Sequence, residues 1–183
     1  MCIGYGLRFG YAIAALVSVG TTAQAADWQV SEASSPLTGA VTVSATLDST
    51  QPLANMLGLA QPATLVIRCS GRDLATYVIW PQVLSVFDTK PVLLGAGSPE
   101  TMVDWKVDNG EIAVNFWTIS SEGIAAGKFT TGGALKILRK LEGAHRLVVR
   151  MTGRITQDAV FDLGEVAPVI ARAEQTCGVA GER

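Results

Sequence analysis

The stretch TLVIRCSGRDLATYVIW, residues 64–80, decides the fold class of this sequence. Residues 64–69 are apolar or β-branched at nearly every position, which is typical of a strand covered on both faces. The turn residues 70–73 follow, and residues 75–80 return as the partner strand of a hairpin. Pro81 ends this second strand because proline cannot donate a hydrogen bond to a sheet ladder. The stretch therefore predicts an antiparallel hairpin within a β-sheet.

Further strand patterns flank this hairpin on both sides. The segments of alternating or β-branched character are residues 41–47, 101–107, 112–117, 146–151 and 158–162. Asn109-Gly110 separates the two middle strands, and this pair favours a tight hairpin turn in which both residues take positive φ. Residues 28–38 are polar and contain Ser35-Pro36, so they are predicted to form a loop with a turn. Residues 48–60 are predicted to be a connection with a short helical turn.

Helical periodicity appears only late in the chain. After Gly133, leucines recur at threefold spacing in residues 134–141, with Lys and Arg on the other side. A second helix is expected near residues 166–176. Together these elements predict a mainly β fold of the α+β kind, an antiparallel β-sandwich or barrel-like sheet with two short helices. Residues 26–183 contain no internal linker or repeat and are expected to form a single domain.

The first 25 residues have the three parts of a secretory signal peptide. Arg8 supplies the positive charge, and residues 11–19 form an apolar run too short to cross a bilayer. Small residues then precede the expected cleavage boundary between Ala25 and Ala26. We therefore expect the mature chain in the bacterial periplasm, without a transmembrane segment.

The cysteine count favours one disulfide. Cys2 leaves with the signal peptide, so only Cys69 and Cys177 remain. Two thiols in an oxidising compartment favour a bridge, which here closes a loop of about 100 residues and stabilises the fold by up to ~4–5 kcal/mol. The alternative is two separate buried thiols. The sequence has no CxxC motif, so a redox enzyme is not expected.

The charge balance argues against polyanionic partners. The chain has 14 Lys and Arg against 16 Asp and Glu, a net charge of −2, and loss of Arg8 makes the mature chain one unit more negative. Binding to nucleic acid or to anionic lipid needs clustered basic side chains. We therefore expect neither partner.

Candidate catalytic groups are few. His145 is the only histidine and has no neighbouring nucleophile, so a surface loop position is the simplest interpretation. One histidine and two paired cysteines leave no ligand set for zinc, and no cofactor motif is present. Asp104 and Asp108 flank the Asn-Gly turn, and Asp158 and Asp162 share one face of a strand, which a glycosidase could use, but turn capping and exposed charge explain both pairs more simply. No catalytic residue, metal ligand or cofactor is therefore expected.

The four tryptophans divide into two groups. Trp80 and Trp117 lie in apolar strand patterns and are predicted to be core. Trp28 and Trp105 are the candidates for an exposed binding surface for a sugar or a peptide.

The order of several short motifs across residues 28–178 resembles the VasI/TagO family of small exported proteins associated with type VI secretion. The positions that carry the likeness are Ser35-Pro36, Arg68-Cys69, Trp117, Ser120, Phe161-Asp162 and the closing Cys177. The resemblance implies an accessory role without known catalytic residues.

These observations lead to three hypotheses about function. The first is a non-enzymatic accessory or adaptor protein of the bacterial envelope, which binds an envelope protein in connection with type VI secretion. It should carry an apolar surface patch of roughly several hundred Å². The second is a periplasmic module that binds a cell-wall fragment or peptide in a deep pocket with aromatic walls. The third is a hydrolase with a carboxylate site.

Overall fold

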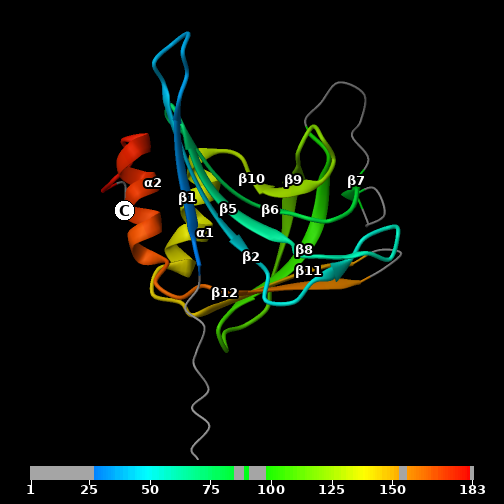
Figure 1. Ribbon diagram of the computed structural model, residues 1–183. Helices are drawn as coiled ribbons and strands as arrows, with labels where there is room; N and C mark the ends of the chain where they lie inside the picture. Colours follow the sequence, from blue (N-terminus) through cyan, green and yellow to red (C-terminus); the bar gives the residue numbers. More distant parts are fainter. Residues whose placement is uncertain (1–26, 85–88, 91–97, 153–155, 182–183) are drawn as a thin grey trace, which may run out of the picture.

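The computed structural model describes residues 27–84, 89–90, 98–152 and 156–181 (Figure 1). The expected signal peptide and its cleavage boundary at Ala25 and Ala26 lie outside the described residues.

One large antiparallel sheet dominates the fold (Figure 1). Its strand order is β1-β2-β5-β6-β10-β9-β8-β11-β12. The bounds in this order are β1 (Gln29–Ser34), β2 (Val41–Asp48), β5 (Thr64–Ser70), β6 (Asp73–Ile79), β10 (Ala125–Lys128), β9 (Ala113–Ile119), β8 (Glu100–Val107), β11 (Arg146–Met151) and β12 (Gln157–Asp162). The predicted hairpin of residues 64–80 is β5 and β6, which pair from Thr64↔Ile79 to Ser70↔Asp73.

Smaller elements complete the chain. β7 (Thr89–Lys90) pairs with β8, and β3 (Leu53–Ala54) pairs with β4 (Ala60–Gln61) as a separate two-stranded sheet. The helices are α1 (Thr131–Leu141) and α2 (Ala167–Cys177). The predicted fold class is confirmed, because the described chain is mainly β, with one large antiparallel sheet and two short helices.

The large sheet is curved and barrel-like, because the segment after β2 lies against β12 at the far end of the strand order. The Thr50 backbone N–H donates to the Val160 carbonyl at 2.7 Å, and the Gln157 side-chain amide donates to the Ala54 carbonyl at 2.8 Å. The curvature gives the sheet an inner and an outer face.

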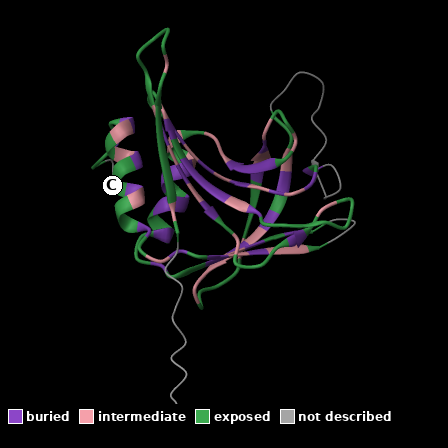
Figure 2. Cartoon of the chain, in the orientation of Figure 1, coloured by how far each residue is buried: buried purple, intermediate pink, exposed green. Residues whose placement is uncertain are grey.

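The core lies between the inner face and the two helices. Leu65 and Ile67 of β5 and Leu74 and Val78 of β6 are buried on this face. α1 packs on β6 and β10, and α2 packs on β5 and β2 (Figure 1). Buried segments accordingly gather where helices and sheet meet (Figure 2). The alternate residues of β5 and β6, among them Arg68 and Tyr77, occupy the outer face.

The predicted disulfide is confirmed and joins Cys69 of β5 to Cys177, the last residue of α2. The two Cα atoms are 5.7 Å apart, and both side chains are buried. The bridge therefore fixes α2 to the inner face of the sheet.

Among the described residues, five strands were not predicted: β1, β3, β4, β7 and β10. β1 lies in residues 28–38, which were expected to form a loop; only its last part is the expected turn, where the Ser35 carbonyl accepts from the Gly39 N–H at 2.8 Å. All six residues of β1 are exposed, because β1 is an edge strand held by pairing with β2 and by an ion pair of 2.9 Å between Glu32 and Arg172 of α2. β10 was also missed, and residues 48–60 contain β3 where a helical turn was expected.

The hairpin predicted at Asn109-Gly110 is present, because β8 and β9 pair antiparallel, but the expected backbone conformation of its turn was wrong. Positive φ occurs at Asp108 (49°) and at neither residue of the pair. The Asp108 carboxylate accepts from the backbone N–H groups of His145 and Arg146 at 3.0 and 2.7 Å, and the Asp108 N–H donates to the Arg146 carbonyl. These bonds hold the end of β8 against β11, so the connection to β9 is wider than a two-residue turn.

Candidate functional site

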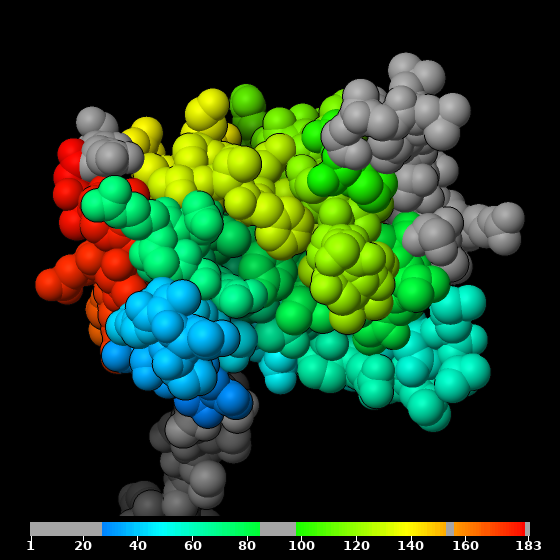
Figure 3. All heavy atoms as spheres, turned by 90° about the horizontal axis from the view of Figure 1, so that it is seen from above, coloured from blue at the N-terminus to red at the C-terminus, as the bar shows by residue number. Residues whose placement is uncertain are grey.

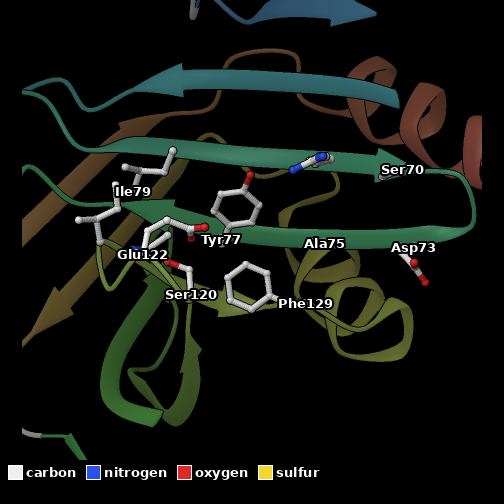
Figure 4. Close-up of a pocket in the computed structure, with 11 residues that line it drawn as sticks. Ser70, Asp73, Ala75, Tyr77, Ile79, Ser120, Glu122 and Phe129 are labelled. Carbon is white, nitrogen blue, oxygen red and sulfur yellow. Dashed lines mark hydrogen bonds between the residues drawn. The ribbon is translucent and has the colours of Figure 1, made fainter. Parts of the chain in front are cut away.

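A groove on the outer face of β5 and β6 is a candidate site (Figure 4). Its volume is about 390 Å³. The lining residues come from β5, β6, the turn between β9 and β10, β10 and the residue that follows it; they are Arg68, Ser70, Asp73, Ala75, Tyr77, Ile79, Ser120, Glu122, Ile124, Ala125 and Phe129. We call this the aromatic groove.

Two stacked rings form the middle of the aromatic groove. The centroids of Tyr77 and Phe129 are 5.2 Å apart with 30° between the ring planes. Figure 4 shows them side by side, with Ser120 and Glu122 toward the Ile79 end and Asp73 at the opposite end. Both rings are only partly buried, so they offer apolar surface to a ligand.

Gly127 of β10 makes this arrangement possible. It pairs with Tyr77, and a Cβ at Gly127 would lie 2.3 Å from Tyr77 Cβ and 2.3 Å from the Thr76 carbonyl oxygen. Any other residue would therefore push β10 away from β6 and displace Phe129, which follows two residues later.

A tight turn shapes the Ile79 end of the groove. The Ser120 N–H donates to the Ala125 carbonyl at 2.8 Å, and the Gly123 N–H donates to the Ser120 carbonyl at 2.9 Å. Hydrogen bonds from its own backbone N–H and from the Ser121 hydroxyl hold the pKa of Glu122 below its usual range. The Glu122 carboxylate is therefore charged at neutral pH.

The charges along the groove are of both signs. Arg68 lies opposite Ala75 in the β5–β6 register and is exposed. Glu122 and Asp73 supply negative charge at the two ends. The groove can therefore contact an apolar side chain at its centre and polar groups at its rim.

A larger cavity lies between β9 and α1. Its volume is about 960 Å³, and Trp105 and Trp117 line it together with three lysines. The two tryptophan rings are 6.4 Å apart, and Lys140 Nζ lies 5.0 Å from the Trp105 ring centroid.

The expectation that Trp105 offers an exposed binding surface was wrong. Trp105 is only 5% exposed, because it faces inward with Val103 on β8, and its Nε1–H donates to Asn115 Oδ1 at 2.8 Å. Trp28 is half-buried, and its Nε1–H donates to the Leu163 carbonyl at 2.9 Å. Trp80 and Trp117 are core residues, as predicted.

The positions that carry the family resemblance lie in the core, in turns and exposed strand ends, and in the aromatic groove. Phe161 and Trp117 are buried, and the Asp162 carboxylate accepts from the Gly164 N–H at 3.3 Å. Ser35 and Pro36 lie in the turn after β1. Arg68 and Ser120, which are 52 positions apart in the chain, both line the aromatic groove.

Three of the four carboxylates in the pairs Asp104/Asp108 and Asp158/Asp162 have a hydrogen-bond partner in the structure. Asp108 binds backbone N–H groups, and Asp162 accepts from a backbone N–H. Asp158 is 2.6 Å from Arg150, and hydrogen bonding to this guanidinium lowers the pKa of Asp158. Asp104 lies opposite Arg150 on the neighbouring strand. His145 is exposed and lies just before β11.

Within the described residues, no group of three or more His, Cys, Asp or Glu side chains is placed to hold a metal ion. No helix in that part of the chain is long and apolar enough to span a membrane.

Sequence reasoning missed the aromatic groove. The alternation of Ala75, Tyr77 and Ile79 with buried residues places these three side chains on one face, and this signal was available. Phe129 could not be assigned to the same face, because the strand that brings it there was not recognised.

Comparisons of the chain with protein-family models, curated proteins and solved structures gave no match.

Proposed function

We propose that the protein is a non-enzymatic accessory protein of the bacterial envelope that binds a protein partner through the aromatic groove. The observation that carries the proposal is the stacked pair of Tyr77 and Phe129 in an open groove with Arg68 and Glu122 at its rim. Aromatic side chains with an adjacent arginine are enriched at sites that dominate protein–protein binding energy.

The rest of the groove is consistent with this role. Ile124 is 38% exposed beside the rings and enlarges the apolar surface. The rim charges supply the polar contacts that fix the orientation of a partner. A protein loop or strand end that presents one apolar side chain between polar ones fits this groove in size and chemistry.

Two features of the chain support the envelope location. The first 25 residues have the pattern of a secretory signal peptide, and the bridge between Cys69 and Cys177 is of a kind that persists in oxidising compartments. The resemblance to the VasI/TagO family suggests a connection with type VI secretion, and two of the positions behind that resemblance, Arg68 and Ser120, line the groove.

The test is quantitative enrichment of partners from chemically cross-linked envelopes. The tagged wild-type protein is compared with Tyr77→Ala and with Leu37→Ala, a control that removes an apolar side chain 94% exposed at the β1–β2 turn. A specific partner should fall at least about fivefold with Tyr77→Ala, the effect of losing about 1 kcal/mol or more of binding, and should stay unchanged with Leu37→Ala. Equal recovery with all three proteins, at equal melting temperatures, would refute the proposal.

A further inference from the structure

We propose a second binding site, for an elongated small molecule with two anionic groups, in the cavity between β9 and α1. This inference goes beyond the proposed function, because it concerns a different site and a different class of ligand. One anionic group would bind at the start of α1, and the other would bind farther along the helix, near Lys136 and Lys140.

The first observation is the start of α1, where the backbone N–H groups of the first turn have no acceptor within the helix. The N-cap residue Thr130 makes no side-chain hydrogen bond to the helix, and the first turn contains no acidic side chain. Thr130 and Gly133 both line the cavity. The helix dipole adds partial positive charge at this end, so the start of α1 favours an anionic group.

Gly133 leaves room for a ligand beside this helix end. A Cβ at Gly133 would lie 3.0 Å from Thr130 Oγ1 and 3.1 Å from Lys128 Cβ, so a larger residue would fill the space between these side chains. The Lys128 ammonium donates to the Phe116 carbonyl, which holds it at the cavity wall. An ammonium group has three donors, so Lys128 can also bind an anion that approaches the start of α1.

The second observation is a row of groups along one side of α1, which lies at the surface of the molecule (Figure 3). Gly133, Lys136 and Lys140 line the cavity at spacings of three and four residues, which places them on the same face of the helix. At a rise of about 1.5 Å per residue, the row is about 10 Å long. It therefore matches an elongated ligand with an anionic group toward each end.

The charge of the cavity contrasts with that of the chain. Lys128, Lys136 and Lys140 line it, and Glu100 is the one carboxylate among its described lining residues. The whole chain has a net charge of −2, so this excess of positive charge is local. A cavity lined mainly by one sign of charge attracts ligands of the opposite sign.

The third observation concerns the side chain of Trp117 and is independent of α1. Trp117 is 2% exposed and lines the cavity. Its Nε1–H has no hydrogen-bond partner within the described part of the chain. A buried donor without an acceptor is costly, so an anionic oxygen that enters the cavity and accepts this bond is stabilised.

The size of the cavity favours an elongated molecule over a single inorganic ion. Its volume is about 960 Å³, and one small ion would contact only one end of the row on α1. Two anionic groups joined by a chain can contact the helix start and the lysines together.

The test is isothermal titration calorimetry of the purified exported protein with octanedioate, which has a carboxylate at each end of an eight-carbon chain. We expect binding with a Kd below about 1 mM. Octanoate, which has the same chain length and one carboxylate, should bind at least about tenfold more weakly, because one charge-assisted contact is lost.

Two variants locate the site. Lys136 is exposed on α1, so Lys136→Glu changes the charge of the cavity with little change to the fold. The matched control is Lys106→Glu, the same charge change on the outer face of β8. We expect octanedioate to bind at least about fivefold more weakly to Lys136→Glu and less than about twofold more weakly to Lys106→Glu.

The indole N–H resonances give a second readout. The resonance of Trp117, assigned with Trp117→Phe, should shift when octanedioate is added. The resonance of Trp28, which lies outside the cavity lining and donates to the Leu163 carbonyl, should not shift.

The proposal is overturned by no binding of octanedioate up to about 10 mM, by equal affinity for octanoate, by equal effects of the two lysine variants, or by an unshifted Trp117 resonance. Displacement of octanedioate by an equal concentration of inorganic phosphate would likewise overturn it, in favour of a site for a single ion. None of these outcomes bears on the aromatic groove, which the Tyr77→Ala comparison tests separately.

Discussion

Gly127→Ala is expected to destabilise the protein strongly, although it adds a single methyl group. Gly127 pairs with Tyr77 in the β10–β6 ladder. An added Cβ would lie 2.3 Å from Tyr77 Cβ, 2.4 Å from Tyr77 Cα and 2.3 Å from the Thr76 carbonyl oxygen. These distances are roughly 1 Å short of ordinary contact, and the atoms belong to the β6 backbone or are fixed to it.

The magnitude follows from what must move. No rotation of a flexible side chain relieves the overlap, so β10 must shift away from β6 by about 1 Å, against a normal strand spacing of about 4.8 Å. Overpacking costs about 1–3 kcal/mol, and each weakened ladder hydrogen bond adds about 0.5–1.5 kcal/mol. The β10–β6 register has four residue pairs, and losing part of it brings the total to about 3–5 kcal/mol.

The matched control is Gly132→Ala in α1. A Cβ at position 132 meets nothing within 4 Å, and alanine is a better helix former than glycine. The free energy of unfolding of this variant should therefore rise by about 0.5–1 kcal/mol. Both variants are compared with wild type by urea unfolding under oxidising conditions, with tryptophan fluorescence as the signal. A Gly127→Ala protein within about 1 kcal/mol of wild type would refute the geometric reasoning.

Three other predictions concern single interactions. Removing the disulfide should lower the free energy of unfolding by about 2–5 kcal/mol, and by the same amount in Cys69→Ser, Cys177→Ser and the double variant, because each removes the same bridge. Different unfolding free energies of the three variants in urea would contradict this. Asp108→Ala should lower the free energy of unfolding by about 1–2 kcal/mol, because two backbone N–H groups lose their acceptor. Asp108→Asn should lower it less, because asparagine keeps an acceptor oxygen and tolerates positive φ. Equal losses of stability in urea unfolding would count against the capping role. Asp158→Asn should cost at most about 1 kcal/mol, because the ion pair with Arg150 is partly exposed. The pKa of Asp158 is lowered in the folded state, so the stability difference between wild type and Asp158→Asn should have its full size above about pH 4, the range in which a free aspartate titrates, and should vanish as the pH falls further. A stability difference that grows in acid would contradict the assignment.

Much of the fold was predictable because apolar alternation reports directly on burial. Residues 41–47 alternate apolar with hydroxyl side chains, and in β2 the apolar residues Val43, Ala45 and Leu47 are the buried ones. The even count of cysteines in the expected mature chain was enough to predict the bridge between Cys69 and Cys177. These features depend on local pattern or on simple counting.

The missed strands depend on partners far away in the chain. β1 has no buried residue, so nothing in its sequence separates it from a polar loop, and pairing with β2 alone defines it. β10 reads Ala-Ala-Gly-Lys and has no β-branched residue, and at position 127 the space beside Tyr77 admits only glycine. Here tertiary packing decides the structure and overrides propensity.

The candidate site was harder to predict for the same reason. The period of two in residues 101–107 places Trp105 on the same face of the strand as Val103. It does not reveal whether a helix covers that face, and in the structure α1 covers it. Likewise Arg68, Tyr77 and Phe129 form one groove only because β10 lies beside β6.

Site-specific photo-crosslinking in living cells tests the binding role of the aromatic groove most directly. A photoreactive residue replaces Ile124, which is partly exposed in the groove, or Leu57, which is 83% exposed in the β3–β4 turn and serves as the control. Irradiation should give a discrete protein adduct from position 124 that disappears with Tyr77→Ala, and none from position 57. The same adducts from both positions, or an adduct from position 124 that survives Tyr77→Ala, would contradict the account.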